Sequence, residues 1–272
     1  MDVDTTADGI YRFNSADWTL DYSMMVQLQR PGEPYAGPCP FYLVDHPEGT
    51  VLFDTGVSYE MVQDPESYGQ HGAPHMTDFV QTCDIDESRT PVAQLADVGY
   101  DPGDVDYVVM SHLHTDHAGN VSAFPDAEFL VHEDELEYAM WPTATAQRLF
   151  YLDGDLAPLR SHEYDVTALT GRHDVFGDGS VEVFPTPGHS PGHQSLRVEL
   201  PESGTVVLAG DVANLRAGYE AELPAAFSWS LDEATHSIRA VRREEEQHDA
   251  DVFFHHDQED GARFPDPPEK LQ

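Results

Sequence analysis

The sequence is poor in lysine, in cysteine and in long apolar runs. Lys270 is its only lysine, so nearly all of its basic charge is arginine. Against 13 basic residues stand 51 acidic ones, and the formal net charge of the 272-residue chain is −38. A chain with this charge is repelled by the phosphates of nucleic acids, so we expect no nucleic-acid partner.

Cys39 and Cys83 are the only cysteines and do not have the close spacing of a metal motif. We interpret them as two free thiols in a reducing cytosol. No apolar stretch approaches the roughly 20 residues that cross a membrane. Residues 1–4 also lack the basic region and apolar run that open a signal peptide. These absences predict a cytoplasmic protein without a membrane partner.

The acidic residues are spread along the chain and are not confined to a tail. Hydrophobic residues make up 40% of the chain, which is too much for an acidic disordered protein. A folded chain with this charge repels itself, and concentrated salt screens the repulsion. We therefore expect an extreme halophile with a salt-rich cytoplasm; the alternative is an acidic protein that binds basic partners.

The phosphate-binding motifs GxGxxG and GxxxxGK[ST] and the nucleophile motif GxSxG are also absent. The length fits one α/β domain over residues 1–272. Its N-terminal extension, residues 1–35, has two candidate short strands at 18–22 and 24–28. Its proline-rich tail, residues 262–272, is predicted to be either extended along the domain or disordered.

A dense group of metal-ligand residues follows a predicted buried strand at 105–110. His112 and His114 share one face of an extended chain, so they can bind one ion together. Asp116 and His117 come after the strand and can turn toward a second ion. Four ligand-type residues within six exceed the needs of one simple tetrahedral site.

Residues of the same type follow other predicted strands. Asp54 follows the strand 50–53, which forms a hairpin with 41–44, and it is either a carboxylate that orients a ligand histidine or a turn residue. The ends of the remaining strands carry His189, Asp211 and His255-His256. We interpret His193 as structural, and His71 and His75 as solvated surface histidines.

The predicted strands fall into two groups, before and after about residue 170, each mixed with helices. The amphipathic pattern predicts helices at 90–98, 133–140 and 231–247. This arrangement favours two packed sheets with helices outside.

The run His112-Leu113-His114-Thr115-Asp116-His117 matches the HxHxDH signature of the metallo-β-lactamase superfamily. The other residues in that family's order are Asp54-Thr55-Gly56, His189, Asp211 and His256. Within the superfamily, residues 111–114, 116–119, 186–195 and 253–257 resemble the N-acyl-homoserine lactonases. The similarity extends from about residue 38 to 265.

The resemblance implies an αββα sandwich of two mixed sheets, with two divalent ions at one edge. Zinc is the expected metal, with iron, manganese or cobalt as alternatives. One ion would be held by His112, His114 and His189, the other by Asp116, His117 and His256, and Asp211 would bridge them. His255 stands where the family usually has glycine, so we assign the ligand to His256.

The chain departs from the lactonases at Asn214. The family has a tyrosine at this position, three residues after the bridging aspartate, which is thought to assist at the substrate carbonyl or the leaving oxygen. An amide donates a hydrogen bond but does not titrate as a phenol does. Tyr219 is a candidate replacement, and the alternative is a surface loop tyrosine.

The resulting hypothesis is a metal-dependent hydrolase that opens an N-acyl-homoserine lactone or a related lactone or ester. Two ions roughly 3.5–4 Å apart activate a bridging hydroxide, and Asp116 passes a proton to the leaving oxygen. The alternatives are a thioesterase of the glyoxalase II type, a mononuclear-iron oxidoreductase related to the persulfide dioxygenases, and a metal-dependent binding protein.

Overall fold

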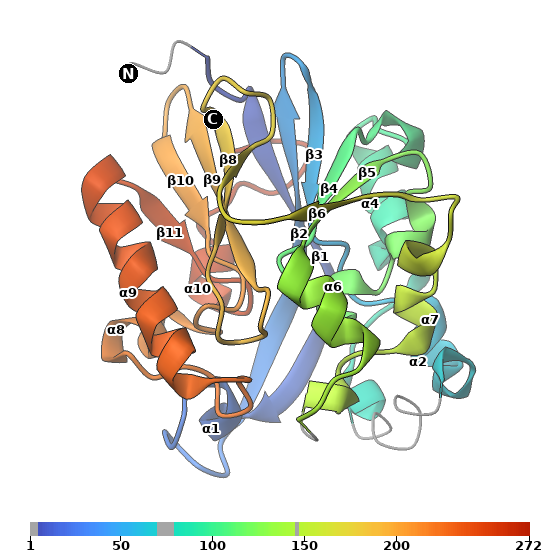
Figure 1. The fold of residues 1–272 in the computed structure, drawn as a ribbon, viewed down its shortest axis with the longest axis vertical. Coiled ribbons are helices and arrows are strands. Elements are labelled where there is room, and N and C mark those ends of the chain that lie inside the picture. Colours follow the sequence, from blue (N-terminus) through green and yellow to red (C-terminus); the bar gives the residue numbers. More distant parts are fainter. Residues whose placement is uncertain (1–4, 70–78, 145–146) are drawn as a thin grey trace.

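Two β-sheets pack face to face, and helices cover their outer faces (Figure 1). The computed structural model describes residues 5–69, 79–144 and 147–272. Within these ranges the arrangement is the αββα sandwich that the sequence predicts, and the fold class is confirmed. His71 and His75 lie outside the described residues.

The first sheet contains the strands of the N-terminal half in sequence order. Its strands are β1 (Gly9–Asp21), β2 (Pro34–His46), β3 (Gly49–Phe53), β4 (Tyr107–Val109), β5 (Glu128–His132) and β6 (Asp165–Leu169). The first three strands are antiparallel, and β3 to β6 run parallel. The predicted hairpin is thus confirmed as β2 and β3, with β2 longer than expected.

The second sheet begins at residue 173, so the predicted division near residue 170 is confirmed. In spatial order its strands are β11 (Asp251–Phe253), β10 (Gly204–Leu208), β9 (Gln194–Leu200), β8 (Val181–Pro185) and β7 (His173–Asp174). All neighbours are antiparallel except β10 and β11, which are parallel.

The α-helices of the described residues are mostly short. They are α1 (Tyr22–Met25), α2 (Tyr59–Gln63), α4 (Pro91–Asp97), α5 (Thr115–Ala118), α6 (Glu133–Met140), α7 (Asp153–Leu156), α8 (Arg216–Ala221), α9 (Leu231–His248) and α10 (Gln258–Gly261). The three predicted helices correspond to α4, α6 and α9. Ser230 caps α9 by accepting the backbone N–H of Glu233, and Asp232 adds a favourable charge in the first turn.

Three apolar layers hold the sandwich together. The layer between the sheets includes Tyr42, Phe53 and Val109 from the first sheet and Val183, Leu196 and Leu208 from the second. A second layer lies between the first sheet and helices α4, α6 and α7, and a third lies between the second sheet and helices α8 and α9 (Figure 1). Each sheet therefore buries both faces, which explains the continuous apolar runs of its central strands.

The N-terminal extension differs from the prediction of two short strands at 18–22 and 24–28. β1 is one long strand because β2 pairs with it from Gly9 to Asp21, across a bulge between Asn14 and Ala16. The chain then turns into α1, because the Asp21 carboxylate accepts the backbone N–H of Ser23 and caps a helix there.

The proline-rich tail lies extended along the first sheet, which decides between the two predicted alternatives. Leu271 exchanges backbone hydrogen bonds with Ile10, and Lys270 pairs with Asp45 at 2.7 Å. Phe264 packs on Phe253 with ring centroids 4.5 Å apart. Among the described residues, no helix is both long and apolar enough to span a membrane.

We expect salt to stabilise the folded chain, because its acidic residues outnumber the basic ones 51 to 13. Raising KCl from about 0.1 M to about 1 M shortens the Debye length from ~10 Å to ~3 Å and weakens this repulsion. Each kcal/mol gained should raise Tm by about 2–4 °C. Differential scanning fluorimetry across a KCl series measures the effect. Sucrose at matched osmolality is the control, and an unchanged or falling Tm in KCl would contradict the prediction.

Candidate metal centre

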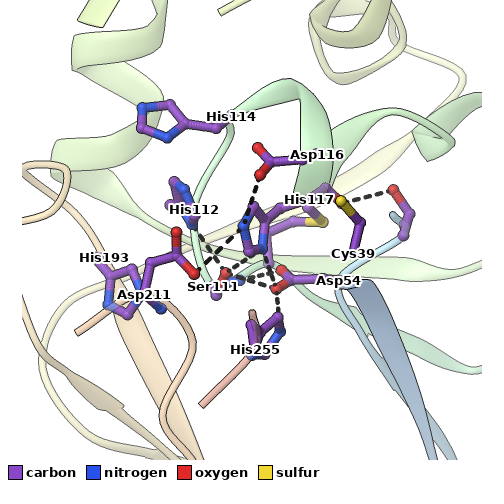
Figure 2. A network of polar contacts seen from close by, with 12 residues as sticks. Cys39, Asp54, Ser111, His112, His114, Asp116, His117, His193, Asp211 and His255 are labelled. Carbon is purple, nitrogen blue, oxygen red and sulfur yellow. Dashed lines mark hydrogen bonds and ion pairs between the residues drawn. The ribbon is translucent and has the colours of Figure 1, made fainter. Parts of the chain in front are cut away.

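The ends of five strands from both sheets meet at one edge of the sandwich. Asp54 follows β3, the segment from Ser111 to His117 follows β4, and His189 follows β8. Asp211 follows β10, and the pair His255-His256 follows β11. Figure 2 shows that the labelled members of this set lie close together: Asp54, Ser111, His112, His114, Asp116, His117, Asp211 and His255. Asp54 and His255, which are 201 positions apart in the sequence, are thus brought within hydrogen-bond distance.

His112, His114 and His189 form the first group. One ring nitrogen of each lies within 4.8 Å of those of the other two, and all three side chains are buried. Nδ1 of His114 is 3.1 Å from Nε2 of His189. Burial lowers the pKa of all three rings, which favours the neutral, ligand-competent form.

Asp116, His117 and His256 form the second group, with one carboxylate oxygen of Asp211. Oδ2 of Asp116 lies 3.7 Å from Nε2 of His117 and 3.6 Å from Nε2 of His256. Oδ1 of Asp211 lies 3.6 Å and 3.2 Å from the same two nitrogens. Donors at ~2.1 Å from one tetrahedral ion are roughly 3.4 Å apart, so these separations suit a single ion.

Asp211 lies between the two groups. While Oδ1 faces His117 and His256, Oδ2 lies 3.4 Å from Nε2 of His189 in the first group. The surrounding imidazoles hold the pKa of the Asp211 carboxyl well below its usual range, although burial acts in the opposite direction. Its position is that of a carboxylate shared by two cations.

Hydrogen bonds set the tautomers of the histidines. Nδ1 of His117 donates to Asp54 at 2.8 Å, and Nδ1 of His256 donates to the carbonyl of Pro38 at 2.8 Å. Nε2 of His114 donates to Oε1 of Gln147 at 2.9 Å. In each ring the other nitrogen therefore turns its lone pair toward the cluster, as outer partners of metal-bound histidines do.

The residues present fit a pair of cations. Nε2 of His112, Nε2 of His117 and Oδ1 of Asp211 are buried without a hydrogen-bond partner among the described residues. Orphaned buried lone pairs of this kind cost free energy unless something satisfies them. A divalent cation in each group would do so, and imidazole and carboxylate are suitable donors.

Asp54 forms hydrogen bonds to several residues of the cluster, as Figure 2 shows. Oδ1 accepts the backbone N–H of Ser111 at 2.7 Å, and Oδ2 accepts from the Ser111 hydroxyl at 2.7 Å. Oδ2 also receives His117 and, at 3.0 Å, Nε2 of His255. Of the two roles considered for Asp54, this geometry fits a carboxylate that orients a histidine. His255 thus faces Asp54, while His256 faces Asp116 and Asp211.

Two buried residues that the sequence analysis did not single out support the loops. Glu135 on α6 accepts the backbone N–H of Leu113 and that of Gly192, at 2.9 Å and 3.1 Å, and so joins the loops after β4 and β8. It also accepts the hydroxyls of Ser190 and Tyr151. The sequence offered one signal for Glu135, its place in the first turn of a helix. The helix dipole alone explains an acid at that place, so this signal did not indicate the role of Glu135 between the two loops.

Gln147 is the second such residue. Its Nε2 donates to the carbonyls of His189 and Phe227, at 3.2 Å and 2.7 Å, while its Oε1 accepts from His114. The amide therefore links both histidine loops to the segment after α8. No sequence pattern marks it, because its partners come from three distant segments.

Asn214 lies inside the site and Tyr219 does not face it. Nδ2 of Asn214 donates to Oδ2 of Asp211 at 3.1 Å, so the amide positions the shared carboxylate. Tyr219 lies on α8 and donates its hydroxyl to Glu245 on α9 at 2.5 Å. Its ring packs on Phe254. The suggestion that Tyr219 replaces the family tyrosine is therefore corrected: its hydroxyl is engaged in the helix layer, and it is not a loop residue either.

His193 has the structural role that the sequence indicated. Its Nε2 accepts the backbone N–H of Asp211 at 2.9 Å, and its Nδ1 lies 2.9 Å from the hydroxyl of Thr186. Burial lowers its pKa to about 4, so the ring stays neutral and can accept this bond.

Comparison with known proteins identifies relatives of the whole chain. The sequence profile described as the metallo-beta-lactamase superfamily matches residues 34–256. N-acyl homoserine lactonase AttM of Agrobacterium fabrum is 35% identical over 246 residues, which cover 89% of this chain and 90% of that protein. N-acyl homoserine lactonase AiiA of Bacillus thuringiensis subsp. kurstaki is 32% identical over 268 residues, 96% of this chain and 99% of that protein.

Solved structures agree with the sequence relatives. An N-acyl homoserine lactone hydrolase with the product N-hexanoyl-L-homoserine bound at its catalytic metal centre superposes with a TM-score of 0.83. It is 29% identical, and the match covers 98% of this chain and 100% of that one. A quorum-quenching N-acyl homoserine lactone lactonase gives the same TM-score at 28% identity and the same coverage.

Glu135→Gln should destabilise the chain, because a neutral amide would turn an N–H toward one pair of the four donors that Glu135 accepts. Hydrogen bonds to a charged acceptor contribute about 1.5–3 kcal/mol each, so we expect a loss of about 2–4 kcal/mol in the free energy of unfolding. Urea unfolding of both proteins measures it. Glu137→Gln, at an exposed position of the same helix, is the control; equal stabilities of the two variants would refute this role.

Asp155 on α7 should make stability fall with rising pH. Neither of its carboxyl oxygens has a hydrogen-bond partner among the described residues, and burial raises its pKa to about 8. Between pH ~4 and ~8 the folded chain keeps this proton while the unfolded chain releases it, so folding loses up to about 1.4 kcal/mol per pH unit.

Asp155→Asn removes this titration. We expect the variant to gain stability over the parent as pH rises from about 5 to about 8, measured by urea unfolding of EDTA-treated protein. Asp126→Asn, at an exposed position, controls for the loss of one negative charge. Parallel pH profiles for the Asp155 variant and the parent would rule the explanation out.

Proposed function

This chain belongs to the metallo-beta-lactamase superfamily, and we propose that it is a metal-dependent hydrolase that opens the lactone ring of N-acyl homoserine lactones. The observation that carries the proposal is the agreement of relatives along nearly the whole chain. Lactonases at 32–35% identity cover 89% or more of it, and a product-bound lactone hydrolase superposes on 98% of it. The two ligand groups would supply the metal centre that such a reaction requires.

His112, His114 and His189 would hold one ion, and Asp116, His117 and His256 the other, with Asp211 shared. When bound, two divalent ions supply Lewis-acid polarisation of the ester carbonyl and lower the pKa of water. Proton transfer and positioning are the tasks of the protein's own side chains. Hydrogen bonds within the protein already set the positions of these side chains.

Asp116 is the proposed proton carrier. It is 9% exposed, the largest value among the seven proposed ligands, so it lies on the open side of the cluster. Water adds its oxygen to the carbonyl carbon, and the bond from that carbon to the ring oxygen breaks. A carboxylate oxygen of Asp116 can take the proton of the water and deliver it to the ring oxygen, which leaves as the hydroxyl of an N-acyl-homoserine.

Asn214 acts as a positioning residue in this scheme. Asn214 stands in place of the family tyrosine, and its amide donates a hydrogen bond to Oδ2 of Asp211. Because Asp211 contacts both ligand groups, a fixed orientation of its carboxylate also fixes how the two groups lie relative to each other. The proposal therefore assigns no direct contact with substrate to Asn214 or Tyr219.

Two aromatic rings suit an acyl substrate. Phe150 packs against His114 with ring centroids 5.1 Å apart, and Phe227 packs against His189 at 5.5 Å. The two phenyl rings are 5.1 Å from each other and half-buried. They form an apolar wall beside the first histidine group, against which an acyl chain would bury surface.

The competing hypotheses have less support. A mononuclear-iron oxidoreductase needs one ligand group, whereas the chain presents two groups joined by Asp211. A thioesterase would use the same centre, but AttM and AiiA, which match most of this chain, are named lactonases. We propose zinc as the metal and a salt-rich cytoplasm as the setting, supported respectively by the nitrogen-rich donor set and the net charge of −38.

His114→Ala should abolish lactone opening, because it removes a donor of the first group. We expect kcat/KM for hexanoyl-homoserine lactone to fall about a thousandfold or more, since polarisation by a metal contributes several kcal/mol. Activity is measured by pH-stat in concentrated KCl, with metal content determined on the same samples.

His162→Ala is the matched control, because His162 is an exposed histidine outside the cluster. A glutathione thioester is assayed alongside the lactone. EDTA-sensitive ring opening that is lost in the His114 variant supports the proposal. A His114 variant with normal activity and metal content would contradict the proposal. Cleavage of the thioester while the lactone stays intact would instead identify a thioesterase.

A further inference from the structure

Cys39 lies beside the second ligand group. Its sulfur, a carboxylate oxygen of Asp116 and a ring nitrogen of His256 are all within 4.8 Å of one another. Cys39 is fully buried on β2, and Figure 2 shows it on the Asp116 side of the cluster. The sequence predicted an ordinary free thiol, because Cys39 is 77 positions from Asp116 and has no spacing of a metal motif.

The backbone around Cys39 is held firmly against the site. The N–H of Cys39 donates to Oδ1 of Asn14 at 2.9 Å, and its carbonyl accepts the Ser15 hydroxyl at 2.7 Å. The preceding carbonyl, of Pro38, accepts Nδ1 of His256 at 2.8 Å. Pro38 and Cys39 are neighbours on β2. One short segment of this strand therefore orients the His256 ring and places the Cys39 side chain next to it.

We propose that Cys39 is a sulfur ligand of the second metal ion, beside Asp116 and His256, an inference that rests on the proposed two-metal function. Donors at ~2.1–2.3 Å from one tetrahedral ion lie roughly 3.4–3.7 Å apart, so a sulfur within 4.8 Å of the other two donor atoms reaches the same ion after a shift of at most about 1 Å. As the sulfur–metal bond forms, the thiol releases its proton to solvent and binds as thiolate.

The sulfur would complete a mixed donor set at the second ion. With His117 and the shared Asp211, the ion would have five donors, a number that zinc reaches in protein sites. The first ion would have only imidazole nitrogens and the Asp211 oxygen. Because thiolate prefers softer ions, the second position should select zinc, cobalt or cadmium over manganese or magnesium. The two positions would then differ in metal preference.

The competing role is that of a small buried apolar side chain. A buried cysteine often behaves in this way, with its S–H a weak donor to a neighbouring oxygen. That role predicts no bond between sulfur and metal and no effect of Cys39 on which ion is bound. A spectroscopic readout separates the two roles without relying on turnover.

The experiment is a cobalt titration of metal-depleted full-length protein, followed by absorption spectroscopy. Thiolate coordination produces an intense near-ultraviolet charge-transfer band from sulfur to cobalt, separate from the visible ligand-field bands. We expect this band as the second equivalent binds. Cys39→Ser should lose it and keep the visible bands, and it should bind cadmium at the second position about tenfold or more weakly.

Cys83→Ser is the matched control. Cys83 belongs to no ligand group among the described residues, so this variant should keep the band. Two bound cobalt ions without the band in the parent protein would overturn the inference and leave the two-metal centre standing. A band retained in Cys39→Ser would overturn it as well. Failure of the parent to bind two ions would instead contradict the proposed function. If Cys39→Ser does not fold, the Cys83→Ser spectrum still decides, because Cys39 is then the only cysteine in the chain.

Discussion

Burial of unpaired metal-ligand atoms is the constraint on which this structure depends. Three such atoms, from His112, His117 and Asp211, lie in the interior without a hydrogen-bond partner among the described residues. A fold tolerates this free-energy cost only where something satisfies the buried atoms, and a cation in each ligand group would do so. The carboxylates around His117 and His256 raise the pKa of both rings although burial lowers it, because negative charge is concentrated beside them.

The protein meets this constraint with a second set of buried polar groups. Asp54, Glu135 and Gln147 each accept or donate several hydrogen bonds, and each connects segments far apart in the sequence. Asp54 links the end of β3 to the loop after β4 and, through His255, to the loop after β11. These hydrogen bonds join loops that follow different strands. The geometry of the cluster therefore follows from the packing of the two sheets.

The charges at the surface and those in the metal centre differ in how strongly solvent and salt screen them. The 51 acidic residues are mostly free to be solvated, and salt screens their repulsion. Inside the cluster water is largely excluded, so Asp116, Asp211 and the histidines interact at close range and are screened much less. The contribution of Cys39 belongs to this interior: a fully buried sulfur beside Asp116 and His256 adds a soft donor to a set of nitrogen and oxygen atoms.

Local signals in the sequence are enough to predict the fold class and the kind of chemistry. The periodicity of its strands and the break near residue 170 predicted two packed sheets, because these signals are local. The run from His112 to His117 predicted a metal centre, because close spacing of ligands needs no tertiary information. The tertiary structure alone decided which side chains complete the site. Glu135, Gln147 and Cys39 have partners on other strands and loops, and Tyr219 is turned into the helix layer. Only the packing of the sheets brings distant residues within bonding distance, so no local pattern could identify them.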